Sequence, residues 1–258
     1  ECEGERGGGG GGGAGGSEDE SDLQLCSDWP VLTDWLIDVA AEDDLRPETV
    51  HSAVTFVNVL LSAVTIRRSK FQLLGAAALF VAAKLHETDE AVPSLDHLVD
   101  LGAEAYTRSS MGAAEATLFS ILRFDLCTPT VWSFATHYLS LLPSEVRHAV
   151  TRRVQYLSEV SLLRHDLVAG DPWVTAAAVV VAALTSLPGQ NRQSAYDLWY
   201  SSGFVVSGLD PVAEPLASSI KTLADVRAQV GPDTDLAAVY LKYRELHEQL
   251  HEQQQQAR

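Results

Sequence analysis

One run of residues near the end of the chain has types and spacing suited to metal chemistry. Residues 247–251 read His-Glu-Gln-Leu-His, and a helix would place the two histidines one turn apart on the same face. Two imidazoles in this arrangement can hold a zinc ion, and the glutamate between them can act as general base toward a bound water. This run is the one enzyme-like motif in the sequence, so a zinc hydrolase is the first function class to consider.

The surroundings of this motif argue against a zinc enzyme. No residue suited to a third ligand follows at the usual distance, since only Glu252 remains before a run of glutamines. A Gly-x-Ser-x-Gly elbow, which would indicate a nucleophilic hydrolase, is also absent from the sequence. We therefore predict that the protein is not an enzyme and has no metal site and no cofactor. The zinc hydrolase is kept as a remote alternative.

Charge and composition exclude further function classes. The 258 residues carry a formal net charge of −17, from 35 acidic and 18 basic side chains. Nucleic-acid binding needs clustered Lys and Arg, so no nucleic-acid partner is expected. No apolar run reaches about 18 residues, so no membrane span is expected either. Cys2, Cys26 and Cys127 stand apart without metal-ligand spacing, which favours free thiols in a reducing compartment.

Helices must position any functional residue, and the chain is organised around one of them. Residues 68–87 read RSKFQLLGAAALFVAAKLHE, and nearly every residue from Phe71 to Leu85 is apolar or small. A helix that is apolar all round must be enclosed by other helices. Ser69 and Gln72 have the spacing of a capping box, which predicts the start of this helix.

The central helix occurs twice in the sequence. Residues 75–84 (GAAALFVAAK) and 175–184 (TAAAVVVAAL) match at an offset of 100 residues. Because similar helical patterns flank both copies, the match indicates a duplicated five-helix unit. The copies differ where Lys84 in the first corresponds to Leu184 in the second. A charge at the end of only one copy is a candidate for function rather than for folding.

The hydrophobic periodicity predicts an all-α fold with two tandem five-helix units. Residues 1–22 are Gly-rich and then acidic, which predicts a disordered tail. We expect a first unit over residues 23–127, a second unit over 128–231 and a C-terminal helix within 232–258. Asp28, Asp171 and Asp210 each precede a proline closely and are predicted as N-caps. The predicted helices span approximately 29–41, 47–64, 69–87, 94–101, 107–122, 129–142, 144–166, 172–187, 193–202, 211–229 and 234–256.

Several motifs on this plan resemble those of the cyclin family. Asp34-Trp35-Leu36 resembles the DWL of the cyclin box, and residues 73–84 resemble the family's central helix, which ends in Ala-Ser/Ala-Lys. Residues 105–107 (AYT), 124–126 (FDL) and 129–130 (PT) resemble the end of a cyclin A/B-type box and the start of its second fold. The resemblance implies tandem cyclin-box folds and a regulatory subunit, nearest the mitotic A/B type. Such a subunit binds and activates a cyclin-dependent kinase in the nucleus and cytoplasm.

The resemblance also implies kinase-contact residues. In cyclins, the lysine that closes the central helix and a glutamate in the fifth helix contact the kinase near its mobile catalytic helix. These residues match Lys84 and Glu115, and Leu85, Phe119 and Leu126 match apolar contact positions around them. Both charges also have a plain structural interpretation, because a terminal lysine interacts with its own helix and a glutamate is often a solvated helix residue. Their register with the motifs favours the contact role.

A second implied site is a substrate-docking groove on the first helix, where the sequence departs from the family. Cyclins of this type carry Met-Arg-Ala-Ile-Leu before DWL and dock Arg-x-Leu segments there, whereas residues 28–32 read DWPVL in this chain. Asp28 replaces the apolar first member, so we expect docking of kinase substrates or inhibitors to be altered or weak. The residues assigned to this divergent groove are Val31, Leu32, Trp35, Asp38, Arg68 and Gln72.

A buried ion pair of the family is also missing. Its arginine and aspartate match Trp29 and Asn58, so both charges are lost together and no unpaired buried ion remains. The divergence keeps a second function class open, namely a cyclin-fold adaptor or transcription-linked cyclin that acts without classical kinase activation. A binding and phosphotransfer assay with candidate kinases would distinguish the two classes.

Overall fold

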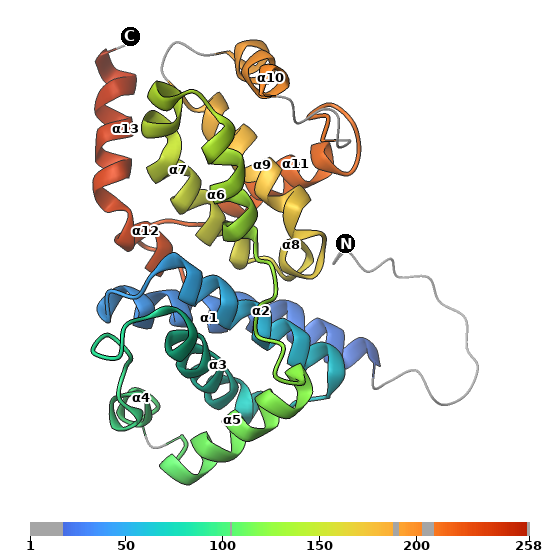
Figure 1. The fold of residues 1–258 in the computed structure, drawn as a ribbon, viewed down its shortest axis with the longest axis vertical. Coiled ribbons are helices and arrows are strands. Elements are labelled where there is room, and N and C mark those ends of the chain that lie inside the picture. The colour runs from blue at the N-terminus through green and yellow to red at the C-terminus, as the bar shows by residue number, and fades with distance from the viewer. Residues whose placement is uncertain (1–17, 104, 188–190, 203–208, 257–258) are drawn as a thin grey trace, which may run out of the picture.

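The computed structural model describes residues 18–103, 105–187, 191–202 and 209–256 (Figure 1). These residues form helices and loops without a strand, which confirms the all-α prediction. They build two stacked units (Figure 1). The first unit contains α1 (Glu18–Glu42), α2 (Pro47–Ala63), the 3-10 helix η1 (Arg68–Lys70), α3 (Phe71–His86), α4 (Leu95–Leu101) and α5 (Arg108–Leu122). The second contains α6 (Val131–Leu141), α7 (Ser144–Leu162), α8 (His165–Ala169), α9 (Pro172–Thr185), α10 (Arg192–Ser201) and α11 (Leu216–Arg227), and is followed by α12 (Ala238–Lys242) and α13 (Arg244–Gln256).

Helix α3 is enclosed at the centre of the first unit, as its apolar sequence predicts. Residues 73–79 and 81–83 are all buried, and α1, α2 and α5 pack around them. Gly75 marks a close approach of two helices, because a Cβ placed there would lie 2.9 Å from Leu32 Cδ1 on α1. The small residues of α3 therefore set how closely its neighbours can pack.

Helix α9 repeats this arrangement in the second unit. It packs against α6, α7 and α11, and its residues 174–181 are buried. The two copies end differently, as the sequence predicts. Leu184 is fully buried, whereas Lys84 is exposed at the surface.

Two predicted helix starts in the first unit are wrong. Helix α1 begins at Glu18 rather than near Trp29, so Asp28 lies inside the helix and is not an N-cap. The start overlaps the predicted tail, of which residues 1–17 lie outside the described residues. Helix α3 follows η1 and is preceded by Lys70, which makes no side-chain cap, so the capping box of Ser69 does not form.

The second unit also departs from the predicted helix boundaries. Asp210 does not cap a helix, because it accepts hydrogen bonds from Tyr200 Oη at 2.8 Å and from the backbone N–H of Val212 at 3.0 Å. Helix α11 therefore begins at Leu216 instead of 211. Asp171 precedes α9 as predicted, but its side chain makes no cap hydrogen bond.

Two helices predicted as continuous are each divided. The segment 144–166 forms α7 and the short α8, and the segment 234–256 forms α12 and α13. Tyr243 lies at the second break and is buried, where its Oη donates to Glu159 Oε1 at 2.9 Å. Lys242 Nζ lies 2.9 Å from the same carboxylate oxygen. A buried carboxylate on α7 thus anchors the end of α12, and α13 continues beside the second unit (Figure 1).

The junction between the units contains the two residues that replace the family's ion pair. Trp29 Nε1 donates to the carbonyl of Leu162 at 2.8 Å, and the indole meets the His165 ring edge-on at 4.8 Å. His165 Nε2 lies 3.0 Å from Asn58 Oδ1. Trp29 and Asn58 therefore both contact one histidine of the second unit.

Asp34 of the DWL motif joins the first helix to the end of the fold. Its Oδ1 accepts a hydrogen bond of 3.2 Å from the backbone N–H of Ala238, at the start of α12. Burial raises the Asp34 pKa to about 6, and the neighbouring charge of Asp38 acts in the same direction. The motif thus has a structural role that the sequence alone did not reveal.

Candidate functional site

Two polar contacts hold the last turn of α3 against α2. Glu87 Oε1, just after α3, accepts a hydrogen bond of 2.8 Å from the backbone N–H of Arg46 at the start of α2. His86 Nε2 lies 2.8 Å from Ser52 Oγ on α2. These contacts fix the rotation of the helix end. Lys84, in the same turn, consequently projects to the surface, where the partial negative charge of the helix end favours a cation.

Lys84 and Glu115 meet on this surface. The capping box of Thr107 and Ser110 starts α5, which runs beside α3 and brings Glu115 to the end of that helix. Lys84 Nζ forms an ion pair with Glu115 Oε1 and lies 4.1 Å from the centre of the Phe80 ring. The two side chains keep 39% and 23% of their surface exposed. Exposed pairs of this kind stabilise a fold by only about 0–1 kcal/mol, so both charges remain available to a partner.

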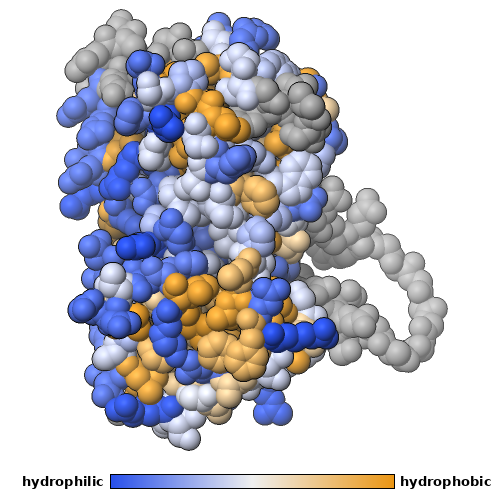
Figure 2. Space-filling view, viewed as in Figure 1, coloured by the Kyte–Doolittle hydropathy of each residue, from blue (hydrophilic) through white to orange (hydrophobic). Residues whose placement is uncertain are grey.

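Apolar side chains surround the ion pair. Leu85 is 39% exposed, whereas Phe119 and Leu126 are half-buried. Phe119 stacks on Phe124 with ring centres 5.2 Å apart, and Phe124 is 75% exposed. Figure 2 shows apolar side chains gathering on this face of the first unit. The structure therefore brings all five predicted contact residues to the α3–α5 side of the unit.

Phe124 is a candidate contact that the sequence analysis did not assign. Arg123 and Phe124 have positive φ values of 52° and 59°, which turn the chain sharply after α5. This turn places the Phe124 ring outside the core beside Phe119. Two successive left-handed residues other than glycine are rare, so sequence patterns give little warning of this geometry.

A groove lies between α1 and the start of α3, at the place where the sequence predicts a docking groove. It has a volume of about 310 Å³, and its walls include five of the six assigned residues. Asp38 is exposed on α1 but does not line the groove. The lining residues are Asp28, Val31, Leu32, Trp35, Arg68, Phe71 and Gln72.

Asp28 and Arg68 give this groove a charged end. Arg68 Nη2 lies 2.8 Å from Asp28 Oδ1, and the carboxylate is buried while the guanidinium is largely exposed. Asp28 therefore has two effects on the groove. It replaces an apolar residue of the family, and it holds the Arg68 guanidinium at the groove. Phe71, which the sequence analysis did not assign, supplies an additional apolar wall. The sequence pattern did not identify Phe71 because it predicts a helix start at Ser69, whereas α3 begins at Phe71, directly after η1.

The zinc-like motif lies on α13, where one of its histidines is described in full. The His247 ring stacks on Tyr240 at 4.4 Å and meets Tyr156 edge-on at 4.8 Å. Burial lowers the His247 pKa, and the charge of Arg227 lowers it further. The side chain of His251 lies outside the described residues. Within the described ranges, no three His, Cys, Asp or Glu side chains gather as metal ligands would.

Among the helices of the described part of the chain, none combines the length and the apolar character that crossing a bilayer requires. Cys127 is a free, exposed thiol directly after the α5 turn.

Comparison with known families identifies the class of protein. Residues 18–127 match the family model described as the cyclin N-terminal domain, and residues 129–256 match the cyclin C-terminal domain. The chain belongs to the cyclin family. This confirms the resemblance that the DWL motif and the central helix indicated.

Curated relatives of this chain are cyclins of the A and B types. Human cyclin-A2 is 32% identical over 183 residues, which cover 70% of this chain and 41% of that protein. The G2/mitotic-specific cyclin-A of Drosophila melanogaster is 36% identical over 138 residues, covering 53% of this chain and 27% of that protein. Cyclin-B2-1 of Arabidopsis thaliana is 32% identical over 162 residues, covering 63% and 37%. The chain thus spans well under half the length of these relatives.

Solved structures share the fold at low sequence identity. A viral cyclin from herpesvirus saimiri aligns with a TM-score of 0.66 and 13% identity, covering 83% of this chain and 88% of that chain. A chain of the CAK complex from Chaetomium thermophilum, bound to ATP-γ-S, aligns with a TM-score of 0.57 and 19% identity, covering 91% and 73%. These similarities support the tandem helical units.

Proposed function

We propose that this chain is a regulatory subunit that binds and activates a cyclin-dependent kinase, nearest the mitotic A/B type, and has no catalytic activity of its own. The observation that carries the proposal is the Lys84–Glu115 pair at the edge of an exposed apolar surface. The membership of the cyclin family supports it, as do relatives whose names place them among A- and B-type cyclins.

The surface can hold a partner helix in one position. Leu85 and Phe124 offer exposed apolar area, and burial of such area drives association. Lys84 and Glu115 lie beside it and can bond the polar backbone groups at the end of a partner helix. Their bonds become stronger once the partner excludes water, because charge-assisted hydrogen bonds gain strength in a drier site.

Activation would follow from a shift of population in the kinase. The cyclin binds the conformation in which the mobile helix of the kinase lies inward, and the binding energy favours that conformation. The inward position aligns the Lys–Glu pair and the catalytic Asp of the kinase with its nucleotide. The proposed role of Lys84 and Glu115 is to secure this helix, and no chemical step takes place on the cyclin.

The test combines purified chain with candidate kinases and measures binding and phosphotransfer. We expect Lys84→Ala and Glu115→Ala each to weaken binding by about 30-fold or more, because a bonded charge at a dry interface contributes about 2 kcal/mol or more. Arg108→Ala is a matched control, since Arg108 pairs with Asp96 at the exposed opposite end of α5. The proposal fails if the wild type activates no kinase, or if the control and the site variants behave alike.

We also propose that the α1–α3 groove docks segments of kinase substrates or inhibitors, with altered preference. Trp35, Leu32 and Phe71 support this, since they offer an apolar surface. Asp28, paired with Arg68, places a carboxylate where the family has an apolar residue. Fluorescence anisotropy with an Arg-x-Leu peptide is the test, and affinity that Trp35→Ala leaves unchanged would contradict the role.

The adaptor function is the second candidate, and the altered groove favours it. An adaptor would bind a partner through the first unit without raising phosphotransfer, so the same assay separates the two functions. For either function we propose action in the nucleus and cytoplasm, which imaging of the tagged chain in dividing cells would test.

A further inference from the structure

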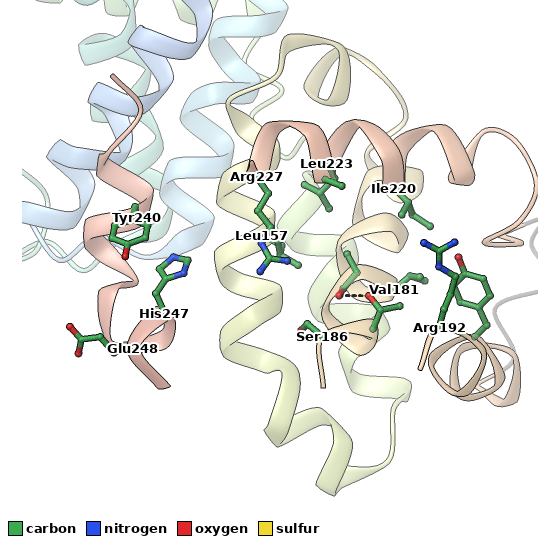
Figure 3. A pocket seen from close by; sticks show the side chains of 14 residues that line it. Leu157, Val181, Ser186, Arg192, Ile220, Leu223, Arg227, Tyr240, His247 and Glu248 are labelled. Atoms are coloured by element: carbon green, nitrogen blue, oxygen red, sulfur yellow. Dashed lines mark hydrogen bonds between the residues drawn. The ribbon is translucent and has the colours of Figure 1, made fainter. Parts of the chain in front are cut away.

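A larger groove lies in the second unit, away from the α3–α5 surface. We name it the second-unit groove, and its volume is about 1040 Å³. Helices α7, α9 and α11 line its middle, with α10 on one side and α12 and α13 on the other (Figure 3). This volume is at the upper end of the range typical for small-molecule sites, which is about 300–1,000 Å³. Nothing in the proposed kinase contact uses this groove.

The position of the groove in the second unit corresponds to that of the Lys84–Glu115 surface in the first unit. Helix α9 is the second copy of α3, and α11 packs along α9 as α5 packs along α3. The groove borders the C-terminal half of α9, from Val181 to Ser186. The Lys84–Glu115 surface lies at the same end of α3. Both units therefore leave a partly apolar surface open at the end of the central helix.

The chemistry of this second surface differs from that of the first. Its middle is apolar, formed by Leu157, Val181 and Leu223 among others. Exposed Arg192 of α10 and exposed Arg227 of α11 line it as well. The groove carries two guanidinium groups against one carboxylate, that of Glu248, in a chain whose net charge is −17. It thus offers an apolar floor with positive charge on a protein that is otherwise acidic.

The positions of the two arginines indicate the shape of an occupant. Figure 3 shows Arg227 and Arg192 on opposite sides of the apolar side chains of Leu223, Ile220 and Val181. A small anion that pairs with one of these arginines would leave the apolar floor between them uncovered. An elongated amphipathic segment with acidic residues toward both ends can pair with both and cover the floor between them.

His247 adds a polar group to the same groove. Its ring extends from α13 toward α7 (Figure 3), where it lies between Tyr240 and Tyr156, and its buried Nε2 has no hydrogen-bond partner among the described residues. Buried polar atoms of folded proteins usually have such partners. The segment that resembles a zinc motif thus supplies two residues, His247 and Glu248, to the wall of this groove.

We propose that the second-unit groove binds an acidic amphipathic helix of a partner protein, with its apolar face on α9 and α11 and its carboxylates beside Arg192 and Arg227. The proposal is independent of the proposed kinase surface, which lies on the first unit.

The binding test uses a defined probe. A fluorescein-labelled peptide of about 14 residues, with leucines along one helical face and glutamates on both flanks, is titrated with the full chain in an anisotropy assay. A twin peptide carries lysines instead of glutamates. Non-specific attraction to an acidic protein would favour the lysine twin, so binding at least about tenfold tighter for the glutamate peptide is the expected result. Equal affinities, a preference for the lysine twin, or no binding of the glutamate peptide would overturn the proposal.

Charge-reversal variants locate the binding site. Arg192→Glu combined with Arg227→Glu should weaken glutamate-peptide binding by about tenfold or more. Lys221→Glu combined with Arg244→Glu makes the same change of charge at exposed positions outside the groove, and should alter affinity by less than about threefold. Similar losses in both double variants would contradict the assignment.

A measurement on the wild type remains informative if a variant fails to fold. The ring resonances of His247 should shift in NMR spectra when the glutamate peptide is added. Inorganic phosphate and dodecanoate are tested alone in the same way. The proposal is overturned if the peptide leaves His247 unshifted, or if either small anion reproduces the full shift and displaces the peptide.

Discussion

Burial of His51 between the two units makes the fold sensitive to acid. The ring is fully buried, with Nε2 lying 3.3 Å from Ser158 Oγ and the ring plane stacked on Trp132. Burial, together with the smaller effect of the Lys242 charge, lowers the His51 pKa from 6.5 to about 3. The unfolded chain therefore takes up a proton at higher pH than the folded protein does. The stability that neutral His51 contributes is complete above pH 6.5 and is lost as the pH falls toward 3.

The size of this loss follows from the two pKa values. At about pH 5 the unfolded His51 is mostly protonated, while the folded one is still neutral. Each pH unit in this window costs about 1.4 kcal/mol, so the free energy of unfolding falls by about 2 kcal/mol between about pH 7.5 and 5. Whole domains are stable by only about 5–15 kcal/mol, so the effect is measurable.

His51→Gln isolates this contribution. Glutamine does not titrate, and its amide can still hydrogen-bond Ser158, so the variant should lack the loss of about 2 kcal/mol. Urea unfolding of both proteins across the same pH series gives the difference, in which the other titrating groups cancel. His148→Gln, at an exposed position on α7, is the control and should follow the wild type. The reasoning is refuted if the wild type and His51→Gln lose stability in parallel.

Three further predictions concern contacts that α1 makes with α3, with the second unit and with α12. Gly75→Ala places a Cβ 2.9 Å from Leu32 Cδ1 and should lower the free energy of unfolding by about 1–2 kcal/mol in urea titrations, after the gain of about 1 kcal/mol in helix propensity; an unchanged or higher value would mean that the Leu32 side chain moves aside at little cost. Trp29→Phe removes the donor to the Leu162 carbonyl and should cost about 1–3 kcal/mol, so a wild-type urea midpoint would contradict the importance of that bond. Asp34 has a pKa raised from 3.8 to about 6, so its contribution to stability is complete below pH 3.8 and is lost as the pH rises through 6. Asp34→Asn cannot ionise and should lack this loss in the same pH series, and an identical pH dependence would exclude Asp34 as its source.

The enclosed helices were the most predictable part of the fold. Residues 71–85 and 172–185 are apolar on every side, and such helices have no stable position except inside a unit. The boundaries that failed depend on contacts between distant residues. Asp210 binds Tyr200 instead of capping a helix, and Tyr243 divides the last helix because it is anchored to Glu159. Local sequence patterns do not indicate such distant partners.

The candidate sites were predictable to different degrees. Family motifs identified Lys84 and Glu115, but their pairing depends on how α3 packs against α5. The Asp28–Arg68 contact joins α1 to η1, so local patterns could not reveal it. The second-unit groove was not predictable at all, because its walls come from six different helices.

The bond from Asp34 to Ala238 spans 204 residues, which has a consequence for the order of synthesis. Ribosomes add about 5–20 residues per second, so α1 waits about 10 to 40 seconds for the segment that covers one of its faces. During that interval the first unit presents an unfinished surface on which chaperones could act. A chain cut short before α12 would keep that face of α1 uncovered permanently.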